Sequence, residues 1–141
     1  RDMKPDIELM QEMLAEAQKR FPNTKFKYCE AREAFRQALN LRETSPCELS
    51  LSFDDNVLKI ESDKKTFGPQ PFFAIKTLSG EYFHDNLDFQ EPFCSWTYTF
   101  DQATFELAAL ENIGVATCDD SGNVTTVVYD VLKGTSSTHN I

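Results

Sequence analysis

The chain has 141 residues, enough for one domain of ordinary size, and 40% of them are hydrophobic, including 12 phenylalanines. This apolar and aromatic composition excludes an intrinsically disordered chain and predicts a real hydrophobic core. The net charge of −9 disfavours general binding to nucleic acid or to anionic membranes, because both depend on lysine and arginine. We therefore expect no nucleic-acid partner.

No apolar run approaches the roughly 20 residues that a membrane-spanning helix needs. The first five residues are also not followed by the apolar core of a signal peptide. The sequence therefore predicts a soluble chain with no membrane partner.

The first predicted element is an amphipathic helix that begins at Asp6, directly after Pro5. Asp6 is its predicted N-cap, and the sequence Phe21-Pro22-Asn23 is expected to end it. Its apolar residues recur at spacings of three and four, as on one face of a helix: Ile7, Met10, Leu14, Ala17 and Phe21.

A short strand and a second helix are predicted next. Residues 24–29 alternate, with Phe26 and Tyr28 on one side, and a helical stripe follows from Ala31 to about Asn40. A single strand cannot bury itself. Residues 1–42 are therefore expected to be either the end of a larger α/β domain or a helical pair packed on the rest of the chain.

The apolar period changes to two after the polar linker that ends at Pro46, and this change predicts a domain boundary near residue 42. Residues 43–133 are expected to form an antiparallel β-sandwich of about seven strands. The polar residues 134–141 are expected to be a flexible tail. The predicted strands are residues 49–53, 57–60, 71–77, 81–84, 95–100 and 104–110, followed by a hairpin over residues 113–131 that turns at 119–123.

The four cysteines are widely spaced and include no Cys-x-x-Cys pair, which disfavours a zinc site or a thioredoxin-like motif. Buried free thiols are the preferred interpretation, and two disulfides in any of three pairings are the alternative. The residues are Cys29, Cys47, Cys94 and Cys118.

Acidic residues after His84 form an oxygen-rich cluster that could hold Ca²⁺, with Asp85 and Asp88 as the candidate metal ligands. The cluster has no glycine to complete an EF-hand pattern, and a solvated loop is the favoured interpretation. We expect no cofactor.

Three aromatic residues, Tyr82, Trp96 and Tyr98, could offer flat faces to sugar rings. The competing interpretation is that alternating aromatics fill the core of the sandwich. No set of nucleophile, base and orienting group can be assembled from the sequence, so no catalytic residue is predicted and the chain alone is expected not to be an enzyme.

Several segments resemble parts of carbohydrate-active proteins. Two segments within residues 6–40 resemble the final helix, strand and helix of a deacetylase-type (β/α) barrel: DIELMQEMLAEAQKRFP and TKFKYCEAREAFRQAL. Two later segments are similar to β-sandwich modules that follow such barrels: PFFAIKTLSGEYFHDNLDF and WTYTFDQATFELAALENIGVATCDDSGN. Ser52-Phe53-Asp54-Asp55 also resembles the Thr-Phe-Asp-Asp motif of polysaccharide deacetylases, but the His-x-x-x-His pair which that chemistry needs has no counterpart here.

This resemblance implies the C-terminal part of a polysaccharide deacetylase-like protein, in which the sandwich is a non-catalytic accessory module for structural support or glycan binding. Its implied partners are a catalytic domain outside this sequence or a glycan, and its implied location is secreted or periplasmic. One alternative is a DNA sliding-clamp-like domain, in which Arg32 and Arg36 face DNA. Another is a protein–protein interaction module that uses an exposed sheet edge.

Overall fold

The structure is a computed structural model that describes residues 2–41 and 45–140. The chain divides into two units, Arg1–Phe35 and Arg36–Ile141. This division lies several residues before the predicted boundary at residue 42, and it falls inside the second helix. The predicted linker residues 42–44 lie outside the described residues.

The first unit contains helix α1 (Lys4–Arg20), which begins two residues before the predicted start at Asp6. Met3, and not Asp6, is the N-cap, and Pro5 lies in the first turn, where a missing N–H costs nothing. Asp6 therefore lies in the first turn, where its negative charge favours the helix N-terminus. The helix ends as predicted, with the backbone N–H of Phe21 bound to the carbonyl of Ala17 at 2.9 Å.

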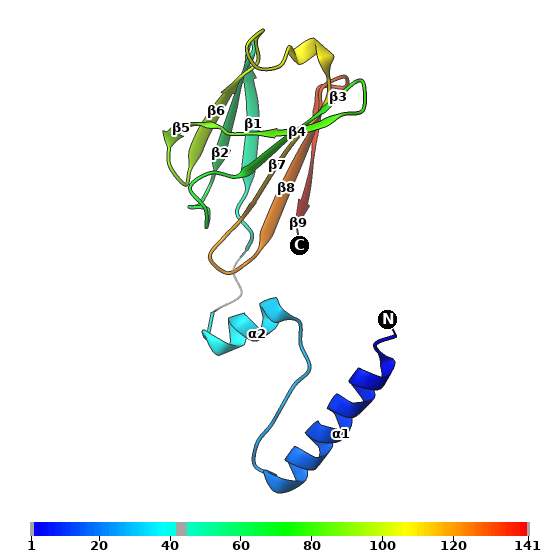
Figure 1. Cartoon of the computed structure of the whole chain (residues 1–141). Coiled ribbons are helices and arrows are strands. Elements are labelled where there is room, and N and C mark those ends of the chain that lie inside the picture. The colour runs from blue at the N-terminus through cyan, green and yellow to red at the C-terminus, as the bar shows by residue number, and fades with distance from the viewer. Residues whose placement is uncertain (1, 42–44, 141) are drawn as a thin grey trace. The chain divides into compact units, whose positions relative to one another are not determined.

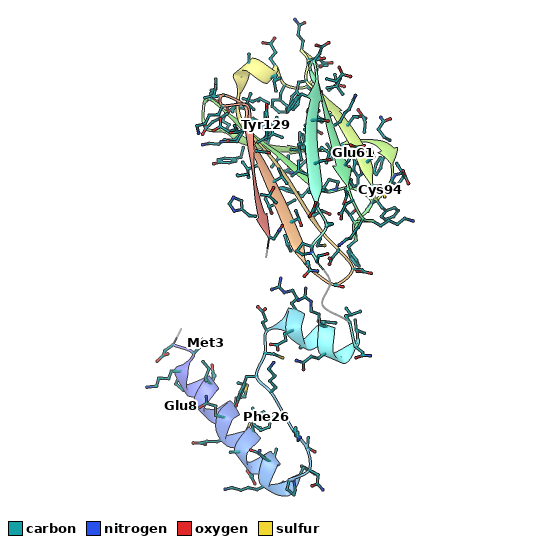
Figure 2. The ribbon with its side chains drawn as sticks, turned by 180° about the vertical axis from the view of Figure 1, so that it is seen from behind. Met3, Glu8, Phe26, Glu61, Cys94 and Tyr129 are labelled. Carbon is teal, nitrogen blue, oxygen red and sulfur yellow. The ribbon has the colours of Figure 1, made fainter. Side chains whose placement is uncertain are left out.

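Residues 24–29 do not form the predicted strand. Apolar alternation alone cannot hold a strand, because its backbone groups need a partner strand to bind. Instead, Phe26 lies beside α1 (Figure 2), where it lines a hollow of about 140 Å³ together with Leu14 and Phe21. The rings of Phe26 and Tyr28 meet edge to face, with centroids 5.6 Å apart.

Helix α2 (Ala31–Ala38) ends two residues before the predicted end at Asn40. Asn40 adopts a positive φ of 51°, the left-handed conformation in which asparagine often terminates helices. No residue of α1 or α2 is buried, and the apolar stripe of α1 is exposed to solvent except for the half-buried Leu14.

The second unit is an antiparallel β-sandwich, as predicted from the two-residue period (Figure 1). One sheet has the order β1-β2-β6-β5 and the other the order β4-β3-β7-β8-β9. The first sheet contains β1 (Leu49–Asp54), β2 (Val57–Ser62), β5 (Asp88–Glu91) and β6 (Ser95–Thr99). The second contains β3 (Phe72–Thr77), β4 (Tyr82–Asp85), β7 (Leu110–Cys118), β8 (Val124–Asp130) and β9 (Thr135–Asn140).

Three segments of the sandwich differ from the prediction. Residues 104–109 form a loop with a short 3₁₀ helix (Leu107–Ala109), and β7 begins only at Leu110. The supposed flexible tail contains β9, which pairs with β8 over six residues from Thr135 to Asn140. β9 and the short β5 are edge strands with every residue exposed, so they lack the apolar alternation that reveals a strand in sequence.

The core lies between the two sheets and is built from the inward-facing residue at every second position. Trp96 is completely buried, and its indole N–H donates to the carbonyl of Pro69 at 2.9 Å. Aromatic rings bridge the sheets: Phe73 and Tyr98 have centroids 4.6 Å apart, and Phe53 and Tyr129 4.9 Å apart (Tyr129 is labelled in Figure 2). The buried apolar side chains of this cluster are Leu49, Leu58, Ile60, Phe73, Ile75, Leu87, Trp96, Tyr98, Phe100, Leu110, Ile113, Val115 and Val127.

Tyr98 is buried within this core, and its hydroxyl donates to Asp85 Oδ2 at 2.9 Å. Burial raises the pKa of Tyr98 well above its ordinary value, and the hydrogen bond to the Asp85 carboxylate raises it further. A raised folded-state pKa contributes stability that is fully present below the unfolded-state pKa of about 10 and is lost as the pH rises through the folded value.

We therefore expect the free energy of unfolding to fall as the pH rises above about 10. Tyr98→Phe should be less stable by about 1 kcal/mol at neutral pH, because the bond to Asp85 is lost, but should show a shallower alkaline decline. Urea unfolding at a series of pH values measures both effects, with Tyr82→Phe as the control that removes an exposed phenol. Equal alkaline slopes in the wild type and Tyr98→Phe would contradict this expectation.

The hairpin between β7 and β8 is held by buried polar groups. Asp119 Oδ1 accepts hydrogen bonds from the backbone N–H groups of Ser121 and Asn123, each at 2.9 Å, and Oδ2 accepts from Asn123 Nδ2 at 2.7 Å. Gly122 supplies the positive φ of 75° that the turn requires. Arg36 donates to the Ser121 carbonyl and to Asn123 Oδ1, so the guanidinium completes this network within the second unit.

The four cysteine thiols are unpaired. Cys47 is buried and Cys94 and Cys118 are half-buried, but Cys29 is exposed, so the prediction of buried thiols is wrong for Cys29. Neither helix in the described part of the chain has the length and apolarity to cross a bilayer.

Candidate ligand-binding face

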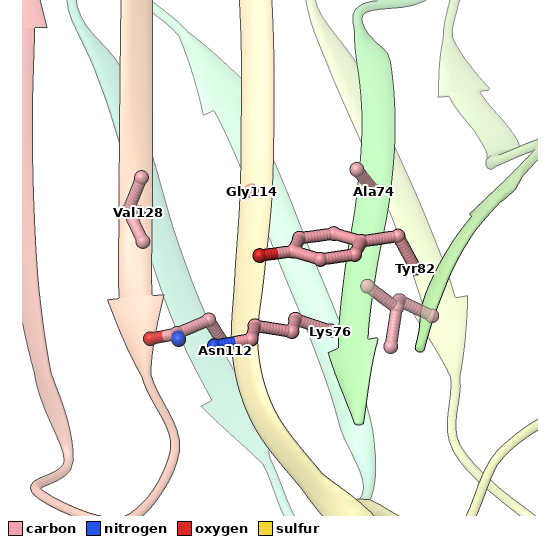
Figure 3. A pocket seen from close by; sticks show the side chains of 7 residues that line it. Ala74, Lys76, Tyr82, Asn112, Gly114 and Val128 are labelled. Atoms are coloured by element: carbon pink, nitrogen blue, oxygen red, sulfur yellow. The ribbon is translucent and has the colours of Figure 1, made fainter. Parts of the chain in front are cut away.

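The outer face of the five-stranded sheet carries a shallow trough. Because adjacent paired residues share a face, Ala74 of β3, Gly114 of β7 and Val128 of β8 form one row across the sheet. Lys76, Tyr82 and Asn112 form part of the next row. Together these residues line a hollow of about 250 Å³ (Figure 3).

Small side chains make the floor of this trough low. Gly114 faces outward, because its neighbours Ile113 and Val115 are buried in the core. A Cβ at Gly114 would come no closer than 3.9 Å to its nearest neighbour, the carbonyl oxygen of Ala74, so the backbone does not require glycine here. Glycine inside a strand is typical of places where another group approaches the backbone closely.

Tyr82 forms the wall of the trough. Its ring lies across β3, with its hydroxyl in front of β7 (Figure 3), and 73% of the residue is exposed. Lys76 Nζ lies 5.8 Å from the centroid of this ring, within the range of a cation–π contact. A large aromatic surface is therefore held in a defined place but left open to solvent.

The ammonium group of Lys76 beside Tyr82 is neutralised by an ion pair. Lys76 Nζ lies 2.8 Å from the Glu111 carboxylate, which raises the pKa of Lys76, and Asn112 Nδ2 also donates to Glu111. The ammonium, carboxylate and amide thus place hydrogen-bond donors and acceptors beside the aromatic ring.

Among the predicted aromatic candidates, the structure leaves only Tyr82 available for stacking. Trp96 is 0% exposed and Tyr98 is 4% exposed, so their predicted role as binding residues is corrected. Both lie on β6, which has a neighbouring strand on each side in its sheet, and both face the opposite sheet.

The candidate metal ligands Asp85 and Asp88 end up in different sheets, on β4 and β5 respectively. The chain crosses between the sheets through the buried Leu87, so the predicted acidic loop is the crossover itself. Asp85 binds Tyr98 and the backbone N–H of Asn86. Within residues 2–41 and 45–140, no group of three histidine, cysteine or acidic side chains could hold a metal ion.

The deacetylase-like aspartates lie in a hairpin turn. Asp54 ends β1 and accepts from Lys59 at 3.0 Å, and Asp55 adopts a positive φ of 53° in the turn. His84 and His139 belong to the other sheet, on β4 and β9. The structure therefore does not bring these aspartates and histidines together.

Sequence reasoning missed most residues of this face, including Phe72, Lys76, Asn112 and Gly114. Phe72 and Phe73 are adjacent in β3, and alternation shows that they face opposite sides without showing which side is the core. The signal that could have found the trough is the isolated Gly114 between the β-branched Ile113 and Val115 inside a strand.

No family model matches this chain, and comparison with curated proteins and with solved structures gave no match either.

Proposed function

We propose that the β-sandwich is a non-catalytic module of a carbohydrate-processing protein and that it binds glycan at the trough beside Tyr82. The observation that carries the proposal is the exposed Tyr82 ring above a floor of small residues, with hydrogen-bonding groups at its edge.

The chemistry of sugars fits this combination. A pyranose ring has an apolar face of C–H groups that can stack on an aromatic ring, while its hydroxyls need donors and acceptors around the rim. Tyr82 offers the stacking surface, and Asn112 with the Lys76–Glu111 pair offers the polar contacts.

The two alternatives have less support from the side chains. For a DNA-binding helix, Arg36 is held by Ser121 and Asn123 through its Nε and Nη2 donors, and Arg32 Nη2 lies 3.5 Å from Glu30. For a protein-interaction module, the exposed edge strand β9 is available, but its side chains are all small, polar or histidine, and interface hot spots favour large aromatics and arginine.

The test is a titration of the full chain with a panel of neutral oligosaccharides, followed by calorimetry or by NMR chemical shifts. We expect Tyr82→Ala to weaken binding by at least roughly tenfold, because the stacking surface is removed, and Tyr82→Phe to retain most of the affinity. Gly114→Val should also block binding by filling the floor, without lowering stability, since valine suits a strand.

The matched control is Phe67→Ala, which removes an aromatic ring that is 71% exposed on a loop outside the trough. Binding that persists unchanged in both Tyr82→Ala and Gly114→Val, or no binding to any glycan of the panel, would overturn the proposal. DNA binding that weakens steeply with salt and is lost in Arg32→Ala would instead favour the clamp-like alternative.

A further inference from the structure

A second exposed aromatic ring lies on the same face as Tyr82. Phe72 begins β3 and is 60% exposed, whereas the adjacent Phe73 is buried in the core. The Phe72 ring lies beside that of His84, with centroids 6.2 Å apart and planes inclined by 37°. This pair forms a second aromatic surface next to the trough.

The two aromatic surfaces are separated along the strand direction. Lys76 pairs with Tyr82, and Phe72 lies four residues before Lys76 on β3. At a rise of about 3.3 Å per residue, the strand positions level with Tyr82 and Phe72 are roughly 13 Å apart. One sugar ring cannot reach from Tyr82 to Phe72, whereas a short chain of linked sugars can, and it would pass His84, which lies two residues after Tyr82 on β4.

The floor between these surfaces is low over its whole length. Ala74 and Gly114 are paired in one row, and Phe72 is paired with Ala116 in the next. On β3 and β7, the side chains between Tyr82 and Phe72 are therefore small, and His84, which pairs with Ala74 on β4, lies beside this path. A chain lying along β3 would pass from Tyr82 to Phe72 with His84 on its β4 side.

The charged side chains around the trough are paired with one another. Lys76 is bound to Glu111 at 2.8 Å, and Asp130, in the row of Lys76 and Asn112, is bound to Lys133 at 2.6 Å. Asn112 and Thr126, on the same face, are polar but uncharged. With a net charge of −9 on the whole chain, this face has no excess of positive charge to attract an acidic polymer.

We infer that the trough takes an uncharged oligosaccharide chain that lies along β3 and stacks on both Tyr82 and Phe72, and that it does not select a single sugar unit. The inference rests on the proposed glycan-binding function and adds the length and charge of the ligand. Tyr82 supplies the main stacking surface, and Phe72 supplies the more distant surface that only a longer chain reaches.

The experiment is a titration of the full chain with a series of neutral oligosaccharides of increasing length, using the sugar that binds best in the panel. Affinity should rise roughly tenfold once the oligosaccharide is long enough to reach Phe72. Phe72→Ala should remove this gain and leave the binding of the shortest sugars unchanged, whereas Tyr82→Ala should weaken every length. Phe67→Ala is the control and should change nothing.

Two further comparisons test charge: an oligosaccharide of equal length that contains uronate, and titrations at low and high salt. The uronate chain should bind no better than the neutral one, and salt should have little effect. Affinity that is independent of length, or a Phe72→Ala variant that keeps the length-dependent gain, would overturn the inference while leaving the proposed function intact. A preference for the acidic chain would overturn the assignment of an uncharged ligand, and failure of all sugars to bind would overturn the proposed function itself.

Discussion

Trp96→Ala is expected to lower the free energy of unfolding of the sandwich by about 4 kcal/mol, the largest effect of any single substitution considered for this chain. Trp96 is completely buried among the side chains of both sheets, so truncation leaves a large cavity that the surrounding strands cannot fill. Urea denaturation followed by circular dichroism measures the loss.

Trp96→Phe separates the contribution of the ring from that of the hydrogen bond. Phenylalanine keeps most of the apolar volume but cannot donate to Pro69, whose carbonyl still accepts from the backbone N–H of Phe93 at 3.0 Å. Trp96→Phe should therefore lower the free energy of unfolding by about 1–2 kcal/mol. Phe67→Ala, on the surface, should change stability by less than about 0.5 kcal/mol. A loss below about 1 kcal/mol for Trp96→Ala would contradict the placement of this residue in the core.

Asp119→Ala is expected to destabilise the second unit by about 3 kcal/mol. The substitution removes the acceptor of two backbone N–H groups and of the Asn123 amide, all in the hairpin between β7 and β8. Asp119 is itself only 6% exposed, so water cannot easily replace the lost carboxylate.

The adjacent Asp120 provides a matched control. Asp120 is exposed, and its hydrogen bond with Ser121 Oγ is long, at 3.4 Å, so Asp120→Ala should change stability by less than about 0.5 kcal/mol. Urea unfolding compares the two variants, and hydrogen exchange of the Ser121 and Asn123 amides tests whether the hairpin opens locally in Asp119→Ala. Equal stability of both variants would show that the Asp119 network does not hold the turn.

The parts of the fold that could be predicted are those in which local pattern and burial agree. The hairpin of β1 and β2 alternates cleanly on both strands and turns at Asp55 and Asn56, so its position follows from the sequence. Residues 24–29 alternate equally well but form no strand, because pairing depends on a neighbour that no local pattern specifies. β9 is the converse case: pairing with β8 orders a polar segment that carries no apolar signal.

The candidate site shows the same limit. Tyr82 and Tyr98 occupy similar alternating segments, yet one is 73% exposed and the other is 4% exposed. The difference arises because Tyr82 faces outward on the short edge strand β4, whereas Tyr98 faces the opposite sheet from an interior strand. Strand order is a property of the whole fold, so sequence could nominate both tyrosines but could not choose between them.

The buried position of Asn123 has a consequence for covalent modification. Asn123-Val124-Thr125 matches the acceptor pattern for N-linked glycosylation, which transfers a sugar to the side-chain amide nitrogen. In the folded hairpin that nitrogen donates to Asp119, and Asn123 as a whole is only 9% exposed. A transferase would therefore meet an accessible acceptor only before β7 and β8 pair, and a sugar attached at that stage would displace the bond to Asp119 and keep the turn from closing.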